Sequence, residues 1–519
     1  MSDDWQYLPA ELLHLIFKLL SFEELLNCSY VCYNWRRSVL ADRLWKRLLE
    51  KDFSWIGHDS LATANFISEC IYFNNHVPKV KTEVIDDFEY DITLCCYSKY
   101  GKYFAICGED AHFCIYRSKP LEFIHERTLV ETLRWKKIVH AEFSPDEEKI
   151  LLNGTKQDGS GEVAIFLIQP DTGEVHFASR VPSNPPSFRA TWYDSFHIIV
   201  SEIHFFSPET PIGTSVSQLW LSSIDRNSSK TLLVPFLRFL NRRGIIWNPI
   251  FVDVVSPRFR RIIQMSEEAK ADGVTLRQKL SELSLTANID DENVDELKEI
   301  LDKKNECYRC YLEHFETVPK DCSCMCHQDN RKLLIYVSED FSQRLCFKMI
   351  SQKLITDALT MTTFSNRSST QSEPEEDPIE QIMNQFDKPD YHIDFHGAIQ
   401  ALSLSPDQKT LTMSMIRIDE IDACPIKDIK VVDVEKMVVN SIRSKKTDTC
   451  FQKHSVSSNN FLLSSLRDNR IDLWSRHHRG FPVRTIELEN NDILCTALHP
   501  IDNIILIVSS RCVSIYKPS

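Results

Sequence analysis

The sequence is poor in glycine and has no long apolar run. Only 12 of its 519 residues are glycine, and one of its longest aliphatic runs extends from Ile504 only to Val508. A membrane-spanning helix needs about 18 apolar residues or more. The N-terminal segment MSDDWQ is acidic and lacks the basic-then-apolar order of a secretory signal. We therefore expect no membrane partner and no secretion.

The sequence also lacks an excess of basic residues and any familiar catalytic motif. Its formal net charge of −14 argues against non-specific binding to nucleic acid as the main role. It contains no phosphate-binding GxxxxGKS or GxxxxGKT loop, no GxSxG elbow and no HExxH helix. These absences predict a protein that is not an enzyme and has no nucleic-acid partner.

Cysteine is abundant, but its pattern does not indicate a disulfide framework. The 17 cysteines are an odd number, and most of them are scattered inside apolar segments. Without a secretory signal, reduced thiols are the expected state, which predicts a cytoplasmic protein with a nuclear pool. The length allows two or three domains, and an apolar content of 43% is ordinary for a globular chain.

A compact, leucine-rich stretch at residues 8–49 is the most strongly patterned part of the chain. Pro9 suits a helix start, and the apolar residues that follow recur at helical spacing. Ser21, with Glu24 three residues later, is typical of a capping box that opens a second helix. A third apolar segment follows. The residues of these patterns are Leu12, Leu13, Ile16, Phe17 and Leu20 in the first segment, Leu25, Leu26, Cys28 and Val31 in the second, and Trp35, Val39, Leu44, Trp45 and Leu48 in the third.

Three short helices cannot bury so many apolar side chains among themselves. A segment of roughly 40 residues is at the edge of independent stability. Part of its apolar surface should therefore face something else, which is either a partner protein or the rest of this chain. The spacing alone leaves both interpretations open.

The residues themselves resemble the F-box family. Leu8-Pro9-x-Glu11-Leu12, Ile16-Phe17, Val31-Cys32-x-x-Trp35 and Leu44-Trp45 match nearly every apolar anchor of its pattern, although Tyr33 stands where a basic residue is common. An F-box implies binding to the Skp adaptor of a cullin-RING ubiquitin ligase. The adaptor-facing positions that the resemblance implies are Leu8, Pro9, Leu12, Ile16, Leu20, Leu25, Val31 and Trp35.

After a connecting stretch at residues 53–77, which we expect to form a short helical stalk, the sequence changes to short β-branched and aromatic segments separated by turns. Four segments repeat one pattern: an apolar strand, a Ser-Pro-Asp or similar turn, a second apolar strand, a polar turn and a third strand. They are residues 91–117, the segments from Ile138 and from Gly397, and the C-terminal segment. Weaker copies begin at Arg189 and Phe461. Repetition at roughly 40 residues predicts the stacked four-stranded blades of a β-propeller.

These repeats resemble degenerate WD repeats. The predicted fold is therefore mainly β with an N-terminal α part: a three-helix F-box, a short helical stalk and a WD-repeat propeller with seven blades as the first choice. The corresponding domain boundaries are 4–52, 53–77 and 78–519. An unrelated β-sandwich with similar turns is the alternative.

Two insertions interrupt the repeats. Residues 256–330 are charged and carry helical leucine stripes, and residues 366–389 contain the acidic, low-hydrophobicity segment SSTQSEPEEDPIEQ. The first predicts a helical, cysteine-rich insertion and the second a disordered loop.

The first insertion ends in a cluster of metal-ligand residue types. Structural zinc needs four soft or borderline ligands in a tetrahedron, which two cysteine knuckles can supply. A cysteine-rich loop without metal is the alternative, and a two-site RING domain would need more ligands than the stretch offers. The candidate zinc ligands are Cys307, Cys310, Cys322, Cys324, Cys326 and His327.

An F-box followed by WD repeats resembles the F-box/WD-repeat substrate receptors. The resemblance implies a non-catalytic receptor subunit that binds the Skp adaptor and cullin-RING scaffold through its F-box and protein substrates through its propeller, for ubiquitination and proteasomal degradation. No cofactor is required for that role. A scaffold for a cytoskeletal or centriolar complex, without degradation, is the alternative.

Some WD-repeat proteins also contact the damage-specific DNA-binding adaptor of cullin-four ligases through a Trp-Asp-x-Arg box. The resemblance implies such a contact at Trp474, Arg476 and His477, although Ser475 replaces the aspartate and His477 the final arginine.

Overall fold

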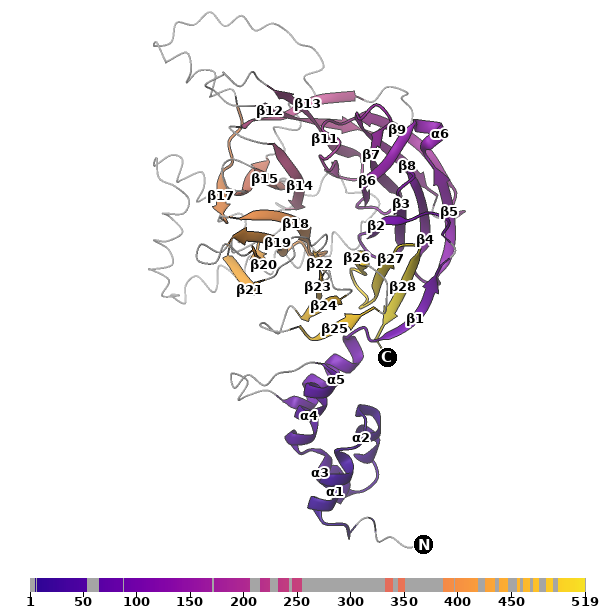
Figure 1. The fold of residues 1–519 in the computed structure, drawn as a ribbon, viewed down its shortest axis with the longest axis vertical. Coiled ribbons are helices and arrows are strands. Elements are labelled where there is room, and N and C mark those ends of the chain that lie inside the picture. The colour runs from indigo at the N-terminus through magenta and orange to yellow at the C-terminus, as the bar shows by residue number, and fades with distance from the viewer. Residues whose placement is uncertain are drawn as a thin grey trace, which may run out of the picture.

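The computed structural model has an N-terminal group of helices followed by a ring of seven four-stranded sheets (Figure 1). The residues that it describes are 5, 7–53, 65–86, 88–169, 172–205, 215–224, 232–241, 245–253, 332–338, 344–350, 386–395, 397–418, 425–434, 438–446, 455–457, 461–466, 470–475, 482–488 and 493–518. Within these residues, no helix is long and apolar enough to cross a membrane.

In the part of the chain that the structure describes, five helices precede the ring, and a sixth joins two of its blades. They are α1 (Ala10–Phe17), α2 (Phe22–Cys28), α3 (Tyr33–Val39), α4 (Asp42–Asp52), α5 (Phe66–His76) and α6 (Val130–Leu133). The prediction of three helices before the stalk is wrong in one respect, because the third segment forms both α3 and α4. The chain breaks at Ala41, whose extended backbone (φ −70°, ψ 117°) ends one helix and caps the next.

The seven sheets are the blades of a propeller, which confirms the predicted fold and blade number. Blades 1 to 6 each use four consecutive strands, from β2–β5 to β22–β25, and blade 7 combines β26–β28 with β1. The strands are β1 (Val80–Ile85), β2 (Ile92–Tyr97), β3 (Tyr103–Gly108), β4 (His112–Arg117), β5 (Glu122–Thr128), β6 (Trp135–Phe143), β7 (Lys149–Lys156), β8 (Gly161–Ile168), β9 (Val175–Pro182), β10 (Thr191–Trp192), β11 (His197–Phe205), β12 (Ser215–Ser223), β13 (Leu232–Asn241), β14 (Ile246–Asp253), β15 (Lys332–Ser338), β16 (Arg344–Ile350), β17 (Tyr391–Asp394), β18 (Ala398–Leu404), β19 (Thr410–Ile418), β20 (Pro425–Asp433), β21 (Val438–Lys446), β22 (Ser455–Ser457), β23 (Phe461–Leu466), β24 (Arg470–Ser475), β25 (Arg484–Glu487), β26 (Ile493–Leu498), β27 (Ile505–Ser509) and β28 (Cys512–Lys517).

Blade 7 closes the ring with strands from both ends of the propeller. β1 pairs antiparallel with β28, from Val80 opposite Lys517 to Ile85 opposite Val513. The inner strands of neighbouring blades then lie against one another, with β2 between β6 and β26. Because this pairing closes the ring, each blade has a neighbouring blade on both sides. The pairing also fixes the end of α5, since β1 directly follows α5 in the chain.

A serine at the end of the inner strand explains the repeated turn in the sequence. The hydroxyls of Ser98, Ser144 and Ser405 each accept the backbone N–H five residues later, at 3.0 Å in all three blades. In two of these turns the serine hydroxyl also donates to the aspartate of Ser-Pro-Asp. These hydrogen bonds satisfy the turn locally, so the same sequence pattern produces the same inner-to-second-strand connection.

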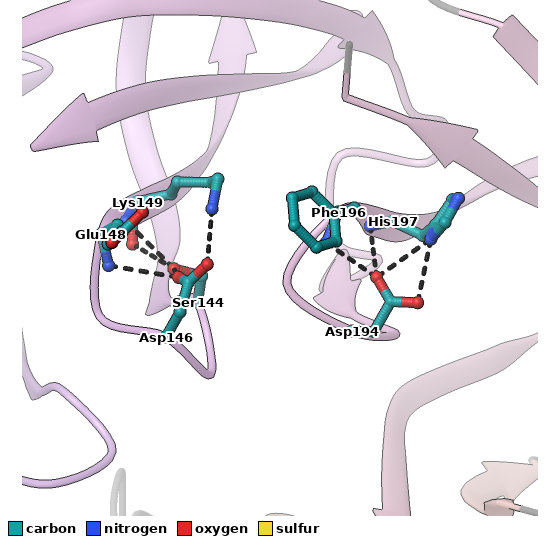
Figure 2. A network of polar contacts seen from close by, with 7 residues as sticks. All are labelled: Ser144, Asp146, Glu148, Lys149, Asp194, Phe196 and His197. Carbon is teal, nitrogen blue, oxygen red and sulfur yellow. Dashed lines mark hydrogen bonds and ion pairs between the residues drawn. The ribbon is translucent and has the colours of Figure 1, made fainter. Parts of the chain in front are cut away.

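These turns also join one blade to the next. Glu147 of blade 2 accepts hydrogen bonds from the Ser98 hydroxyl at 2.5 Å and the Tyr100 backbone N–H at 2.7 Å in blade 1. Figure 2 shows the following joint, where the Lys149 ammonium lies beside the loop of blade 3, 5.3 Å from the centre of the Phe196 ring. Burial tends to raise the pKa of Asp146, but hydrogen bonds from Lys149 and Ser144 lower it below its ordinary value. The carboxylate therefore stays charged opposite the buried ammonium.

The two predicted insertions fall mostly outside the described residues. The first, 256–330, lies entirely within the gap between β14 and β15. Residues 386–389 of the second are described. The Asp387 backbone N–H donates to the carbonyl of Arg238 in β13 at 2.7 Å, and the Asp387 carboxylate accepts from the Arg238 N–H at 2.9 Å. The end of the predicted disordered loop is therefore attached to blade 3.

Candidate adaptor-docking surface

Helix α1 carries apolar side chains on a buried face and on the exposed face beside it. Leu13 and Phe17 are buried, whereas Leu12 and Ile16 are exposed and Leu19, just after the helix, is 82% exposed. Apolar side chains on a helix surface need cover from another element or from a partner. Within the described residues, the face of α1 that carries Leu13 and Phe17 receives such cover, and Leu12 and Ile16 remain exposed.

The turn between α2 and α3 adds to the same kind of surface. Val31 is 61% exposed, and the tyrosines on either side of it are more exposed still. Ten large apolar or aromatic side chains are exposed between residues 5 and 40, and they are Trp5, Tyr7, Leu12, Leu15, Ile16, Leu19, Tyr30, Val31, Tyr33 and Leu40. We call these ten residues the N-terminal apolar surface. Patches of this kind usually mark a protein interface.

Three of the eight positions predicted to face an adaptor belong to this surface, namely Leu12, Ile16 and Val31. Pro9 is also exposed, whereas Leu8, Leu20 and Trp35 are half-buried and pack against the buried cluster. Leu25 is 1% exposed and belongs to the buried cluster under the helices, where it supports the helices that carry the surface. Adaptor contact at the eight positions stays a prediction.

Seven of the ten residues of this surface were not predicted, and each is at least 54% exposed: Trp5, Tyr7, Leu15, Leu19, Tyr30, Tyr33 and Leu40. A signal for Leu15 and Leu19 was present, because Leu12, Leu15 and Leu19 follow one another at spacings of three and four, as residues on one side of a helix do.

Local hydrogen bonds hold the beginning of the surface in place. The capping box predicted at Ser21 is present: the Ser21 hydroxyl accepts from the Glu24 N–H, and the Glu24 carboxylate accepts from the Ser21 N–H at 2.8 Å. Hydrogen bonds from that backbone N–H and from the hydroxyl lower the pKa of Glu24 below its ordinary value. The Asn34 side chain donates to the Leu8 carbonyl at 3.1 Å, which ties the start of α1 to α3.

Helix α5 connects this surface to the propeller. Phe73 of α5 is fully buried, lies 5.4 Å from the Phe53 ring, and shares one apolar cluster with α1, α4 and blades 6 and 7. The Cys70 thiol donates to the Trp45 carbonyl at 3.3 Å, and burial raises its pKa to about 12. Arg484 of β25 donates to the Lys79 carbonyl at 3.3 Å. Packing on both sides of α5 therefore sets where the helices stand on the propeller rim (Figure 1).

The remaining predicted sites lie elsewhere. Trp474 is in β24 and is buried against Ile429 and Leu462, and Arg476 and His477 fall outside the described residues. The candidate zinc ligands Cys307 to His327 also fall outside them. The cullin-four contact and the structural zinc both stay predictions.

Comparison with known proteins agrees with this division into helices and propeller. The F-box-like family model matches residues 5–51. The chain is 21% identical to F-box/WD repeat-containing protein 5 of Mus musculus, over 97% of this chain and 92% of that protein. It is 20% identical to the protein of the same name from Homo sapiens, over 91% of this chain and 87% of that one.

Solved propellers give a weaker likeness. The Cps50 (Swd1) β-propeller domain of Myceliophteria thermophila is 12% identical with a TM-score of 0.45, over 85% of this chain and all of that one. Sqt1 of Saccharomyces cerevisiae is 8% identical with a TM-score of 0.42, over 85% of this chain and 99% of that one.

Proposed function

We propose that this chain, an F-box-like domain joined to a seven-bladed propeller, is the substrate-recognition subunit of an Skp–cullin–F-box ubiquitin ligase. The observation that carries the proposal is the N-terminal apolar surface. Its ten exposed side chains crowd into residues 5–40, whereas a similar number is spread over the whole described remainder of the chain. The Skp adaptor is the partner that an F-box-like domain implies.

Burial of this surface supplies the driving force for binding. Each apolar side chain removed from water on docking contributes about 1.5–3 kcal/mol when it is fully covered. In this proposal the adaptor makes direct contact with two groups of side chains: Leu12, Ile16 and Leu19 on one side, and Val31 on the other. Leu13, Phe17 and Leu25 lie beneath them and keep the surface in shape.

The propeller binds the protein substrate in this proposal, and the chain performs no chemistry itself. Holding substrate and ligase on one rigid frame raises the effective concentration of substrate lysines near the ubiquitin-charged partner enzyme. The packed joint of α5 against Phe53 and blade 6 supports such a frame. Ubiquitination of the bound protein then leads to its degradation by the proteasome.

The decisive test is binding of purified Skp adaptor to the full chain carrying Leu12→Asp and Ile16→Asp. Charges at two exposed positions should weaken binding at least thirtyfold, about 2 kcal/mol, without unfolding the helices. The matched control is Phe123→Asp, which places a charge at an exposed apolar position on β5 of the propeller. Equal binding by the double variant and the wild-type chain would refute the proposed surface.

A second experiment separates a ligase receptor from a scaffold. The wild-type chain and the double variant are purified from cells with the proteasome blocked. In the receptor proposal, cullin accompanies only the wild-type chain, and the proteins that bind both forms accumulate in cells that express only the variant. Bound proteins whose abundance stays the same would favour the alternative of a cytoskeletal or centriolar scaffold.

A further inference from the structure

Two buried cysteines lie side by side where the first and last blades of the propeller meet. Cys95 is in β2, the inner strand of blade 1, and Cys495 is in β26, the inner strand of blade 7. The Cys495 thiol donates a hydrogen bond to the Cys95 sulfur at 3.4 Å, although 400 positions separate the two residues in the sequence. Because β2 packs against β26 in the ring (Figure 1), ring closure itself brings the two thiols together.

Hydrogen bonds on both sides of the pair hold the two blades together. Before Cys95 in the chain, the Ile92 N–H donates to the Ser510 carbonyl of blade 7 at 2.7 Å. After it, Nε2 of the buried His499 ring lies 3.1 Å from the Gly101 carbonyl, and since a carbonyl only accepts, this ring nitrogen donates. The two sulfur atoms therefore face each other inside a joint that is fixed at both ends.

The surroundings of the pair are apolar and nearly closed to water. Cys95 is 7% exposed and Cys495 is 2% exposed, and both belong to one apolar cluster that blades 1 and 7 share. The hydrogen bond from Cys495, together with burial, raises the pKa of the Cys95 thiol well above its ordinary value. Because the thiolate is the reactive form, the pair should respond to a small oxidant that is sustained, and not to a trace of it.

We propose that Cys95 and Cys495 form an oxidative modification site, at which a peroxide joins blade 1 to blade 7 through a disulfide. The thiolate of one cysteine attacks a peroxide oxygen and breaks the O–O bond, which gives a sulfenic acid and one water. The second thiol then attacks the sulfenic sulfur, forms the S–S bond and releases a second water. Two thiols and one hydrogen peroxide thus give one disulfide and two waters, and the peroxide takes up the two electrons.

The reaction needs little movement and would affect the closure of the ring. A disulfide has about 2.05 Å between its sulfur atoms, so these two must approach by about 1.3 Å, which rotation of the side chains can supply. Blade 7 is completed by the pairing of β1 with β28. A bond from β26 to β2 would keep blades 7 and 1 together even when that pairing opens. This inference does not depend on adaptor binding.

The test is peptide mapping of the purified, reduced full chain after treatment with hydrogen peroxide. The remaining thiols are alkylated, the chain is digested with trypsin, and linked peptides are identified by mass spectrometry. The expected product joins the peptide of Cys95 to the peptide of Cys495 and disappears when the sample is reduced before digestion. In urea the same pair should form an at least about tenfold smaller share of the linked peptides, because the folded ring no longer holds the thiols together.

The neighbouring cysteine supplies a matched control. Cys96 lies in the same tryptic peptide as Cys95 but packs against the cluster between blades 1 and 2. Cys95→Ala and Cys495→Ala should each abolish the link, whereas Cys96→Ala should leave it unchanged. Oxidation should raise the unfolding temperature of the wild-type chain and of Cys96→Ala by at least about 3 °C, since the bond closes a very long loop in the unfolded chain. Cys95→Ala should show no such rise in calorimetry.

Three outcomes would overturn the inference. The first is a folded, peroxide-treated chain without the linked peptide. The second is a chain in which Cys495 is joined to Cys96 or Cys512 as readily as to Cys95, since that result would mean unselective oxidation. The third is a link that leaves the unfolding temperature unchanged, because the bond would then not stabilise the closed ring. None of them bears on the Skp adaptor, whose binding is measured separately with Leu12→Asp and Ile16→Asp on the reduced chain.

Discussion

Phe113 in blade 1 and Leu19 beside α1 are both large apolar residues, yet Phe113 is fully buried and Leu19 is 82% exposed. Phe113 packs against Phe166 of blade 2, with 5.0 Å between the ring centres, so its partner comes from the propeller itself. Leu19 and its exposed neighbours have no such cover within the described chain. The difference shows which region is complete by itself and which is shaped for a partner.

The two regions also achieve their order in different ways. The propeller is closed by the pairing of β1 with β28, and its blades share buried side chains around the ring. The N-terminal helices instead rely on caps, on Leu13 and Phe17 inside, and on the cluster that α5 completes. Within the described residues, packing therefore covers one side of the N-terminal helices, and a partner would cover the other side.

The largest expected effect comes from truncating one large apolar residue in each region. Phe113→Ala should lower the free energy of unfolding by about 3–5 kcal/mol, because it opens a cavity between two blades. Leu19→Ala should change it by less than about 0.5 kcal/mol, since its side chain already contacts water. Calorimetric unfolding of the full chain measures both. If Leu19→Ala lowered the free energy of unfolding as much as Phe113→Ala does, the proposed difference between the two regions would be wrong.

The boundary between the regions can be tested through cysteine chemistry. Cys70 in α5 is fully buried, and burial raises its pKa to about 12. Only the thiolate reacts with iodoacetamide, so at pH 8 this thiol should be alkylated about a thousandfold more slowly than an ordinary cysteine. Cys32, which is partly exposed in the N-terminal region, is the internal comparison. Mass spectrometry of the alkylated peptides gives both rates.

Rapid alkylation of Cys70 would mean that α5 separates from α4 and blade 6 in solution. The propeller and the N-terminal helices would then move independently, and the rigid frame of the proposed function would be lost. Slow alkylation, reversed on unfolding in urea, would support one continuous packed unit.

Much of the propeller could be predicted from its sequence, and the exception is instructive. Six blades were recognised as repeats because their strands follow one another closely, in two of them with a Ser-Pro-Asp turn between the first two strands. Blade 4 was not, since residues 254–331 separate β14 from β15 and residues 351–390 separate β16 from β17. Its strands pair antiparallel like those of the other blades, but the interruptions remove the spacing by which a repeat is recognised.

The candidate sites divide in the same way. Only part of the adaptor-docking surface was predictable: Leu12, Ile16 and Val31 match apolar anchors of a family pattern, whereas the other seven exposed residues were not among the predicted positions. A pattern of apolar positions also does not tell inward from outward residues, so it did not indicate that Leu25 is buried.

The smallest expected effect concerns the capping box of α2. This cap stabilises part of the N-terminal region even when no partner is bound. Ser21→Ala removes the hydroxyl that accepts the Glu24 N–H and should cost about 1 kcal/mol, which is roughly a fivefold loss of hydrogen-exchange protection in α2. The strands of blade 1 should keep their protection in the same sample.

Glu24 adds a pH dependence to this cap. Because folding lowers the pKa of Glu24, its contribution is fully present above the ordinary pKa of glutamate, about 4.3, and is lost as the pH falls through the lower value of the folded state. Glu24→Gln should remove that dependence, so the wild-type chain and the variant should differ most at neutral pH and converge in acid. Hydrogen exchange of α2, corrected for intrinsic rates, measures the difference. If the two chains differed more at pH 3 than at pH 7, the cap would not depend on the Glu24 carboxylate, and the stability of α2 would have to come from Leu25 and the cluster beneath it.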